Sequence, residues 1–324
     1  MIVSAIFAAW LAATTGRSAV DAPKKWYKGN LHTHTLNSDG DSTPAAVVSW
    51  YREHKYNFLI LSDHNYLTEV EGLNSVYGAK EKFLLVSGEE VTDSYKGKSV
   101  HVNAYNLKEL VQPAHGASLV ETVRGNIRAI LAKGALPSVN HPNFTWALTA
   151  QDLLEVEELT HFEVYNGHPG VNNHGGGGFD SLDEMWDTLL THGRRIYGIA
   201  VDDAHNFKTF ERNLSNPGRG WVMVQAESLD ADSLTNALRR GEFYASTGVA
   251  LNEVSSSGDE LKVVIQDAPP LKYVTYFIGE QGKILAKSLE LNSVYRRTGQ
   301  EKYVRARVEA SNGDVAWTQP VFPK

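Results

Sequence analysis

The sequence predicts an α/β fold built on a parallel sheet, followed by a smaller antiparallel β-domain. Between about residues 26 and 247, short apolar runs alternate with amphipathic stretches of helical period, which is typical of a parallel sheet, either open or closed into a barrel. After Gly248 the helical period disappears, and apolar and polar residues alternate instead. Five of the twelve histidines, together with several carboxylates, also fall at the carboxyl ends of the predicted strands, where a parallel barrel carries its active site.

Composition excludes several classes of protein. The chain has 324 residues, enough for about two domains, and is 42% hydrophobic and 21% charged, as globular proteins are. A disordered tail, a collagen-like repeat and a coiled coil are therefore excluded. The net charge of −7 provides no overall positive field, so specific nucleic-acid binding is not expected. Because cysteine is absent, disulfides, thiolate metal sites and a cysteine nucleophile are excluded as well.

The first segment has the pattern of a secretory signal. Residues 2–13 form an apolar run, followed by small and polar residues up to Ser18. The run is too short to span a bilayer but suits the apolar core of a signal peptide. We expect residues 1–22 to be a signal peptide and the remaining chain to be exported, to the periplasm or the extracellular space, without a membrane span. A buried N-terminal helix is the alternative interpretation.

The elements of the first region, residues 23–248, follow in order. The first helix has a clear start, because Ser42 and Thr43 can cap it and Pro44 occupies its first turn. Strands are expected at residues 28–32, 58–61, 83–87, 100–105, 136–139, 162–165, 196–201 and 221–225. Helices are expected at residues 44–54, 119–133, 152–159, 182–192 and 232–240.

The second region, residues 249–324, is expected to be an antiparallel β-sandwich domain. Its alternating segments are separated by turn sequences at Gln281-Gly282 and Asn312-Gly313. Strands are expected at residues 261–266, 273–278, 283–286 and 303–310. No Pro/Gly/Ser-rich linker precedes this region, which favours direct packing against the first one.

Histidine and carboxylate residues follow the predicted strands of the first region. They are His32, His34 and Asp39 after the first strand, Asp63 and His64 after the second, Glu89 and Glu90 after the third, His101 within the fourth, His141 after the fifth, and Asp203 and His205 after the seventh. His32 and His34 are two residues apart, so both project to the same side of an extended chain. Each feature alone has a structural explanation, such as a chance surface pair or a strand cap. Their common register with the strand ends favours a shared site.

Metal ions would explain this accumulation. Six imidazoles and several carboxylates at one mouth would repel one another unless they were neutralised, and both groups are good ligands for zinc, manganese and iron. About nine ligands exceed the coordination of one ion, so more than one divalent metal ion is expected. His54, His115, His161 and His192 lie in or beside helices or at a strand start and are interpreted as solvated or structural. His168 and His174 flank the glycine run 175–178, where they either contact substrate or are exposed loop residues.

Taken together in this order, the motifs resemble those of the PHP (polymerase and histidinol phosphatase) superfamily over about residues 28–210. The motifs are Asn30–His34 with Ser38-Asp39-Gly40, Ser62–Asn65, Gly88–Val91, His101, Asn140-His141-Pro142 and Asp203-Ala204-His205. The resemblance implies a distorted seven-stranded β/α barrel that holds two or three metal ions and hydrolyses phosphoester bonds. Trp186 to His205, Gly220-Trp221 and Phe243–Gly248 are similar, more narrowly, to the CehA/McbA-like branch, named after a carbamate hydrolase.

The resemblance also implies the roles of individual residues. His32, His34 and Asp203 match one metal site, with Glu90 bridging to a second; His101 and His141 match the second; and Asp39, His64 and His205 match a third. Asp39 stands where many relatives have histidine, which shifts the third site toward oxygen ligation. Glu89 points to the opposite face of the strand from Glu90 and is expected to support the ligands from behind.

The expected activity is metal-dependent hydrolysis of a small-molecule phosphomonoester or phosphodiester by a metal-bridged hydroxide. His205 or His64 would protonate the leaving group. One alternative is a carbamate or carboxylic ester hydrolase that uses the same metal centre. A second alternative is a non-catalytic exported protein that binds a metal or another ligand.

Overall fold

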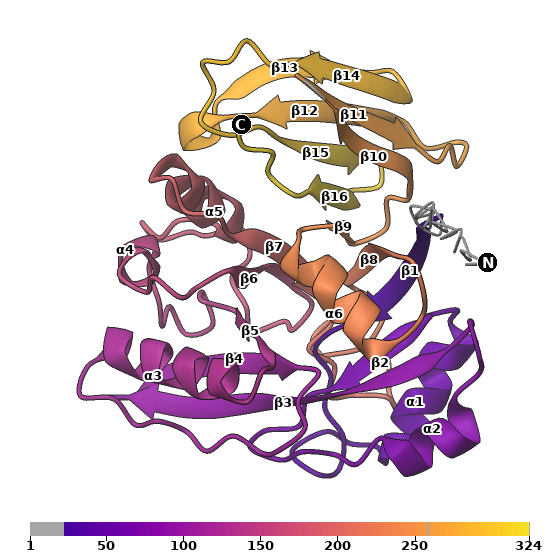
Figure 1. Ribbon diagram of the computed structural model, residues 1–324, viewed down its shortest axis with the longest axis vertical. Coiled ribbons are helices and arrows are strands. Elements are labelled where there is room, and N and C mark those ends of the chain that lie inside the picture. The colour runs from indigo at the N-terminus through magenta and orange to yellow at the C-terminus, as the bar shows by residue number, and fades with distance from the viewer. Residues whose placement is uncertain (1–22, 258, 324) are drawn as a thin grey trace, which may run out of the picture.

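The computed structural model describes residues 23–257 and 259–323. The predicted signal peptide, residues 1–22, lies outside the described residues. Figure 1 shows two regions, with the helices and the first strands in the lower part and the C-terminal strands above them. No helix within the described residues combines the length and the hydropathy needed to cross a bilayer.

Polar caps fix the starts of the main helices. Thr43 accepts from the main-chain N–H of Ala46 at the start of α1, and Ser181 forms a capping box with Glu184 at the start of α5. The helices are α1 (Pro44–Glu53), α2 (Glu71–Tyr77), α3 (Leu119–Ala132), α4 (Ala150–Leu154), α5 (Leu182–Thr191) and α6 (Ala231–Arg239). The short α2 is an addition to the elements that the sequence predicted.

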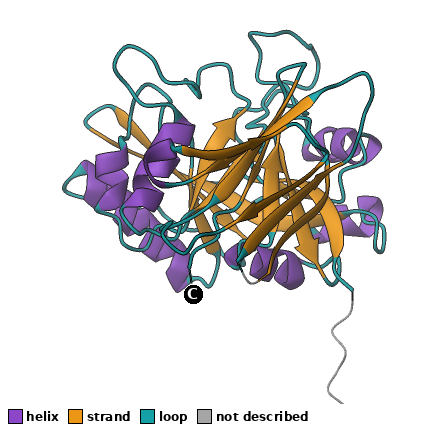
Figure 2. Ribbon diagram, turned by 90° about the horizontal axis from the view of Figure 1, so that it is seen from above, coloured by secondary structure: helices purple, strands orange, loops and turns teal. Residues whose placement is uncertain are grey.

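One curled sheet of thirteen strands forms the centre of the molecule, in the order β13-β12-β15-β16-β9-β8-β1-β2-β3-β4-β5-β6-β7. Figure 2 shows this sheet between helices on either side. The first seven strands are β1 (Lys25–Asn30), β2 (Phe58–Leu61), β3 (Leu84–Tyr95), β4 (Lys98–Tyr105), β5 (Leu136–Val139), β6 (His161–Asn166) and β7 (Tyr197–Val201). The fold is thus a mixed α/β fold with one large sheet.

The expectation of a wholly parallel first region is wrong at three strands. β8 (Trp221–Ala226) is antiparallel to β1 and to β9 (Phe243–Ser246), and β4 is the third exception. The strands β1, β2 and β3 are parallel, as are β5, β6 and β7, but β4 is antiparallel to both of its neighbours. The reason is the connection, because only Lys96 and Gly97 separate β3 from β4, and a turn this short can only reverse the chain.

The end of β7 returns to the end of β1. Thr33 forms a parallel bridge with Ala204, and the Asp203 N–H donates to the His32 carbonyl at 3.0 Å. The His34 N–H donates to the Ala204 carbonyl at 2.9 Å. The carboxyl ends of the first and last of these strands therefore meet, and we call this end of the curled sheet the mouth.

Apolar packing holds the strands in this curve. The side chains of Leu31, Phe58 and Ile60 are buried in one core cluster with residues of β7 and β8. Gly29 is required next to Phe58, because a Cβ atom at residue 29 would lie about 2.1 Å from the Phe58 ring. A larger cluster lies under α3 and α5 and includes Trp186, Tyr303 and Trp317. The last two belong to the C-terminal region, so the two regions share a core.

The C-terminal strands form two layers. The remaining strands are β8 (Trp221–Ala226), β9 (Phe243–Ser246), β10 (Leu251–Ser257), β11 (Glu260–Ile265), β12 (Tyr273–Ile278), β13 (Ile284–Ser288), β14 (Asn292–Arg296), β15 (Arg305–Ala310) and β16 (Val315–Thr318). The layer β10-β11-β14 packs on β12, β15 and β16 through a shared apolar cluster. The second layer continues the central sheet, because β16 pairs with β9. The domain boundary at residue 248 stays a prediction.

Candidate metal centre

The structure brings all nine of the predicted ligands together at the mouth. Their nitrogen and oxygen atoms form four overlapping groups in which the ligand atoms lie within 4.8 Å of one another. The groups are His32, His34 and Asp203; His32, Glu90 and His141; His64, Glu90 and His101; and His34, Asp39, His64 and His205. We call these nine residues the mouth cluster.

Strand ends position the inner members of this cluster. His32 and His34 flank Thr33 after β1, and their Nε2 atoms lie 3.1 Å apart. His141 and Asp203, just after β5 and β7, have positive φ angles of 24° and 50°. Non-glycine residues rarely adopt this conformation, and such strain is concentrated at functional sites. It turns both side chains toward the buried centre, where Asp203 Oδ1 lies 3.1 Å from His34 Nε2.

Glu90 lies at the centre of the cluster and is fully buried. Its Oε2 is 2.9 Å from His64 Nδ1 and 3.2 Å from His32 Nε2, and its Oε1 is 3.1 Å from His101 Nδ1. Glu90 thus belongs to two of the four groups, and its bridging role stays a prediction.

Glu89 is placed differently from the expectation. It faces away from the mouth and accepts from the main-chain N–H of Val111 at 2.9 Å, so it does not support the ligands directly. Burial raises the pKa of the Glu89 carboxyl to about 7.

His101 reaches the mouth by an unexpected route. It lies in the first half of β4, opposite Thr92 of β3, rather than at the carboxyl end of a strand. Because β4 runs antiparallel to its neighbours, its first residues and the carboxyl ends of the parallel strands lie at the same end of the sheet. The Nδ1 atom of His101 has no hydrogen-bond partner, although Glu90 Oε1 is near.

The outer part of the cluster is more open to solvent. The side chain of Asp39 is 56% exposed and lies 3.2 Å from His205 Nε2 and 3.5 Å from His64 Nε2. The Nδ1 atom of His205 lies 2.9 Å from the Asp203 carbonyl and donates to it, which leaves Nε2 directed toward Asp39. Asp39, His64 and His205 are therefore the most exposed members of the mouth cluster.

Three buried polar residues hold the ligands in place. Glu163 Oε1 lies 2.6 Å from His32 Nδ1, and Glu163 Oε2 accepts from the main-chain N–H of His141 at 2.8 Å. The Asn166 amide donates to Asp203 Oδ2 at 3.1 Å, and the Asn140 amide donates to Glu90 Oε1 at 2.7 Å. A carboxylate behind a ligating histidine fixes the ring and its tautomer.

These three residues were not predicted from the sequence. The available signals were the carboxylate and the amide at positions 163 and 166 of β6, and the place of Asn140 in the Asn140-His141-Pro142 motif.

A second support lies under the outer ligands. The buried carboxylate of Asp63 accepts from the Thr35 N–H at 2.7 Å and from the hydroxyls of Ser38 and Thr68 at 2.8 and 2.5 Å. These bonds fold residues 35–40 into the loop that carries Asp39. Asp63 therefore orients the loop and does not itself face the cluster.

The electrostatics of the cluster fit divalent cations. Neighbouring histidines hold the pKa values of Glu90, Asp203 and Asp39 below their usual range, and these carboxylates raise the pKa values of His32 and His205. They also raise the pKa of His64 to about 10, whereas burial lowers that of His34 to about 4.

The geometry of the donor atoms also fits divalent cations. Glu90 Oε2 has three imidazole nitrogens within 3.3 Å but no hydrogen bond. Carboxylate oxygens and imidazole nitrogens that lack a hydrogen bond are of the kind that binds a divalent ion.

The other histidines lie elsewhere. The ring of His168 is centred 5.7 Å from that of His205, beside the cluster, and burial lowers its pKa. His174 is exposed and lines a separate cavity. His161 is buried, with Nε2 3.0 Å from the Leu238 carbonyl, which agrees with a structural role. The exposed ring of His115 contacts Asp93 at 2.9 Å.

Comparison with known proteins shows a related fold. No family model matches the chain. An uncharacterized protein of Methanocaldococcus jannaschii is 27% identical over 158 residues, which cover 45% of this chain and 72% of that protein. A two-domain protein of Bacteroides vulgatus that contains a predicted PHP-like metal-dependent phosphoesterase is 16% identical. The match has a TM-score of 0.53 and covers 92% of this chain and 96% of the other. The chain therefore shares its fold with a two-domain protein of the PHP-like type.

Proposed function

We propose that this chain is a metal-dependent hydrolase of the PHP superfamily, in its CehA/McbA-like branch, that cleaves phosphoester bonds. The observation that carries the proposal is the mouth cluster, in which six imidazoles and three carboxylates converge with ligand geometry. The fold shared with a two-domain PHP-like protein supports it. A protein that only binds a metal does not require nine ligands around a partly open rim.

The ligand atoms are suited to two or three divalent ions of zinc, manganese or iron. His32, His34 and Asp203 would hold one ion, His101 and His141 a second, with Glu90 between them, and Asp39, His64 and His205 a third. Bound ions would supply Lewis acidity and lower the pKa of water, which is the chemistry that ester hydrolysis at neutral pH requires.

The protein's own groups orient the reactants and move protons. The inner ligands are held by Glu163, Asn166 and Asn140, so little reorganisation is needed when the substrate binds. At the rim, His205 and His64 are partly exposed, and each directs its Nε2 toward Asp39. Either imidazolium is placed to give a proton to the leaving oxygen when it is not bound to a metal ion.

A second candidate activity is hydrolysis of carbamates or carboxylic esters. Its support is that, within residues 23–257 and 259–323, no lysine or arginine forms an ion pair with a carboxylate of the mouth cluster. A phosphate dianion would then depend on metal ions and histidines alone for charge compensation. A neutral carbamate has no such requirement.

A substrate panel separates the two activities. Metal-loaded protein is assayed with an aryl phosphate, an aryl phosphodiester, an aryl carbamate and an aryl acetate that share one leaving group. The proposal predicts the highest kcat/KM for one of the phosphoesters, and loss of turnover in His141→Ala. Faster carbamate or acetate hydrolysis, lost in the same variant, would establish the second candidate. No hydrolysis of any substrate by fully metallated protein would favour the non-catalytic alternative.

We also propose that the protein is exported. The support is the apolar run at residues 2–13 with the small and polar residues that follow it. N-terminal sequencing of the protein from a culture fraction tests this, because export predicts a mature chain that begins near residue 23.

A further inference from the structure

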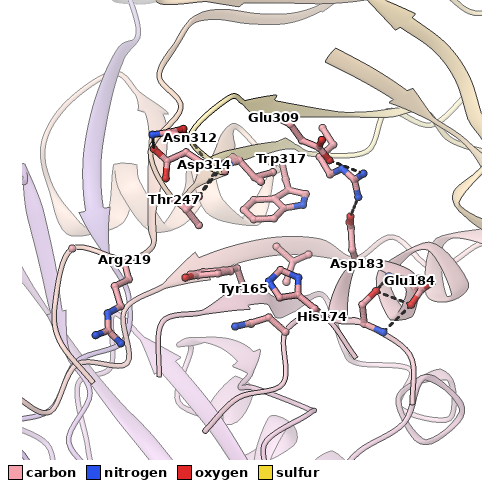
Figure 3. Close-up of a pocket in the computed structure, with 17 residues that line it drawn as sticks. Tyr165, His174, Asp183, Glu184, Arg219, Thr247, Glu309, Asn312, Asp314 and Trp317 are labelled. Carbon is pink, nitrogen blue, oxygen red and sulfur yellow. Dashed lines mark hydrogen bonds and ion pairs between the residues drawn. The ribbon is translucent and has the colours of Figure 1, made fainter. Parts of the chain in front are cut away.

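A cavity of about 680 Å³ lies between the two regions, away from the mouth cluster. Tyr165 of β6 and the segment 173–184 form one wall, and the strands β15 and β16 with their connecting turn form the other (Figure 3). None of the nine residues of the mouth cluster lines it. Its size falls in the range of cavities that bind small molecules.

Trp317 contributes a buried donor without a partner. The residue is only 7% exposed, and its Nε1 atom has no hydrogen-bond partner within the described part of the chain. In Figure 3 the indole ring borders the cavity, with its nitrogen toward the side on which Asp183 and His174 lie. Trp186, by contrast, donates its Nε1–H to the Ile196 carbonyl at 2.9 Å. A buried N–H without a partner is unfavourable, so an acceptor at the cavity would satisfy it.

The charges around the cavity select against an anion. Four carboxylates line it, with only two guanidinium groups. Arg307 is already paired with Asp183 at 2.6 Å and with Glu309 at 2.8 Å. The remaining guanidinium, that of Arg219, donates to the carbonyls of Gly167 and Glu211. A phosphate or a polyanion would therefore meet a surplus of negative charge.

Donors and acceptors remain available on both walls. Asp314 on the β15–β16 turn accepts from the Asn312 amide at 2.6 Å and forms no ion pair with a described residue. Figure 3 places Asp314 on the wall opposite Arg219. The Tyr165 side chain lies at a height between these two residues in that view. The Tyr165 ring stacks on Trp317, with the ring centres 6.1 Å apart. The cavity thus combines an aromatic surface with a carboxylate acceptor and an indole donor.

We propose that this cavity binds a sugar unit, a neutral ring that carries several hydroxyl groups. Each hydroxyl both donates and accepts, so a sugar can accept from the Trp317 N–H and donate to Asp314 in one pose. The apolar face of a sugar ring matches the Tyr165 surface. Being neutral, the ligand avoids the excess of carboxylates around the cavity.

The test is direct binding to the full chain. Metal-free protein is titrated with glucose, galactose, N-acetylglucosamine, maltose and cellobiose, and with sodium phosphate as an anionic probe, while thermal unfolding and tryptophan fluorescence are recorded. We expect at least one sugar to raise the Tm of the wild type, and phosphate to cause no fluorescence change that is lost in Trp317→Phe. Trp317→Phe and Asp314→Asn should each weaken sugar binding at least tenfold, or about 1.4 kcal/mol.

The controls separate binding from folding. Trp317→Phe removes the N–H together with part of a buried indole ring, so the Tm of the sugar-free protein should fall while the protein stays folded, and binding is compared at a temperature below both transitions. Trp146→Phe changes a tryptophan outside the cavity and should bind sugar as the wild type does. Three results would overturn the proposal: no sugar binds at tens of millimolar, the binding is unaffected in Trp317→Phe, or phosphate displaces the sugar from the wild type.

Discussion

Two buried ionic clusters in this molecule differ in what completes them. The mouth cluster contains imidazoles and carboxylates, and no lysine or arginine of the described residues pairs with it. The second cluster consists of Asp183 and Asp187 on α5 and Tyr303 and Arg305 near the start of β15. Here the Arg305 guanidinium, fully buried, donates to both oxygens of Asp187 at 2.8 and 2.7 Å.

In the second cluster, which we call the Arg305 cluster, the chain's own guanidinium pairs with both carboxylates, although Arg305 Nη1 and Asp183 Oδ1 have no hydrogen-bond partner among the described residues. Tyr303 donates to Asp187 at 2.8 Å, and Asp183 lies 2.7 Å from Arg305. These carboxylates hold the pKa of Arg305 above its usual value, and Arg305 holds the pKa of Asp183 below its own. The contacts tie the C-terminal sheet to α5. The comparison teaches that charge density alone does not identify a functional site, whereas charge that the chain's own residues leave uncompensated does.

The largest expected effect is on activity and comes from the mouth cluster. Replacing His141 or Asp203 by alanine should lower kcat/KM by about 10⁴-fold, or about 5 kcal/mol, because a ligand of the proposed centre is lost. The Tm of the metal-free variant should stay near that of the metal-free wild type, since the removed groups repel or strain their neighbours as much as they bind. Steady-state kinetics and thermal unfolding measure the two effects.

His192→Ala is the matched control. His192 is an exposed residue at the end of α5, where its ring contacts the Thr188 carbonyl. Its loss should change neither activity nor metal content. Equal losses of activity in His192→Ala and His141→Ala would contradict the placement of the site at the mouth.

The Arg305 cluster should respond in the opposite way. Arg305→Ala leaves the carboxylate of Asp187 buried without its cation, which should lower the free energy of unfolding by about 4 kcal/mol. The folded fraction should keep its metal content and its kcat, because no member of this cluster lies in the mouth. Urea denaturation and assays on the folded fraction measure both.

A compensating variant sharpens this prediction. Arg305→Met combined with Asp187→Leu and Tyr303→Phe removes the Arg305–Asp187 pair together, while Asp183 keeps its ion pair with Arg307, and should recover most of the lost stability. A triple variant as unstable as Arg305→Ala would show that the ionic contacts, rather than the burial of an unpaired charge, determine the stability at this position.

The sequence predicts the mouth better than it predicts the Arg305 cluster. The ligands follow strands whose ends meet at one edge, so their proximity follows from local pattern and parallel topology. Arg305 lies in the alternating segment Arg305–Ala310, where arginine indicates an exposed face. Its burial depends on α5, more than a hundred residues earlier in the chain.

Long-range contacts also explain why the position of Glu163 and the sheet shared by the two regions were not predicted from the sequence. Glu163 interrupts an apolar strand, and only the fold shows that it lies behind His32. The pairing of β9 with β16 joins segments about seventy residues apart and makes the two regions share a sheet. Neither partner carries a local signal for the other, because strand pairing is set by packing rather than by sequence period.

Removing the metal should destabilise the protein through the mouth cluster and should leave the contacts of the Arg305 cluster unchanged. We expect at least two divalent ions per chain by elemental analysis after supplementation with Zn²⁺ or Mn²⁺. Chelation should abolish activity and lower the free energy of unfolding by about 3 kcal/mol relative to protein with metal at a hundred times its Kd. Chelation should lower the unfolding free energy of Arg305→Ala by the same amount as that of the wild type, because the substitution lies outside the mouth cluster. A metal content near zero after supplementation would refute the proposed centre.

The smallest expected effect concerns His161, a buried histidine outside the mouth cluster. It shows the effect of burial on a histidine pKa separately from the effect of clustered ligands. Burial lowers the pKa of His161 to about 4, against an ordinary value of 6.5, and the positive charge of Arg239 contributes to the decrease. Below pH 6.5 the unfolded chain takes up a proton that the folded chain refuses, so stability present above pH 6.5 is lost as the pH falls toward 4. Between pH 7 and pH 5 this loss amounts to about 2 kcal/mol. His161→Gln keeps a donor for the Leu238 carbonyl but does not titrate, so its decrease in unfolding free energy over this range should be smaller by that amount. Urea denaturation at both pH values measures the difference, and equal pH dependence in the two proteins would show that His161 is protonated in the folded state despite its burial.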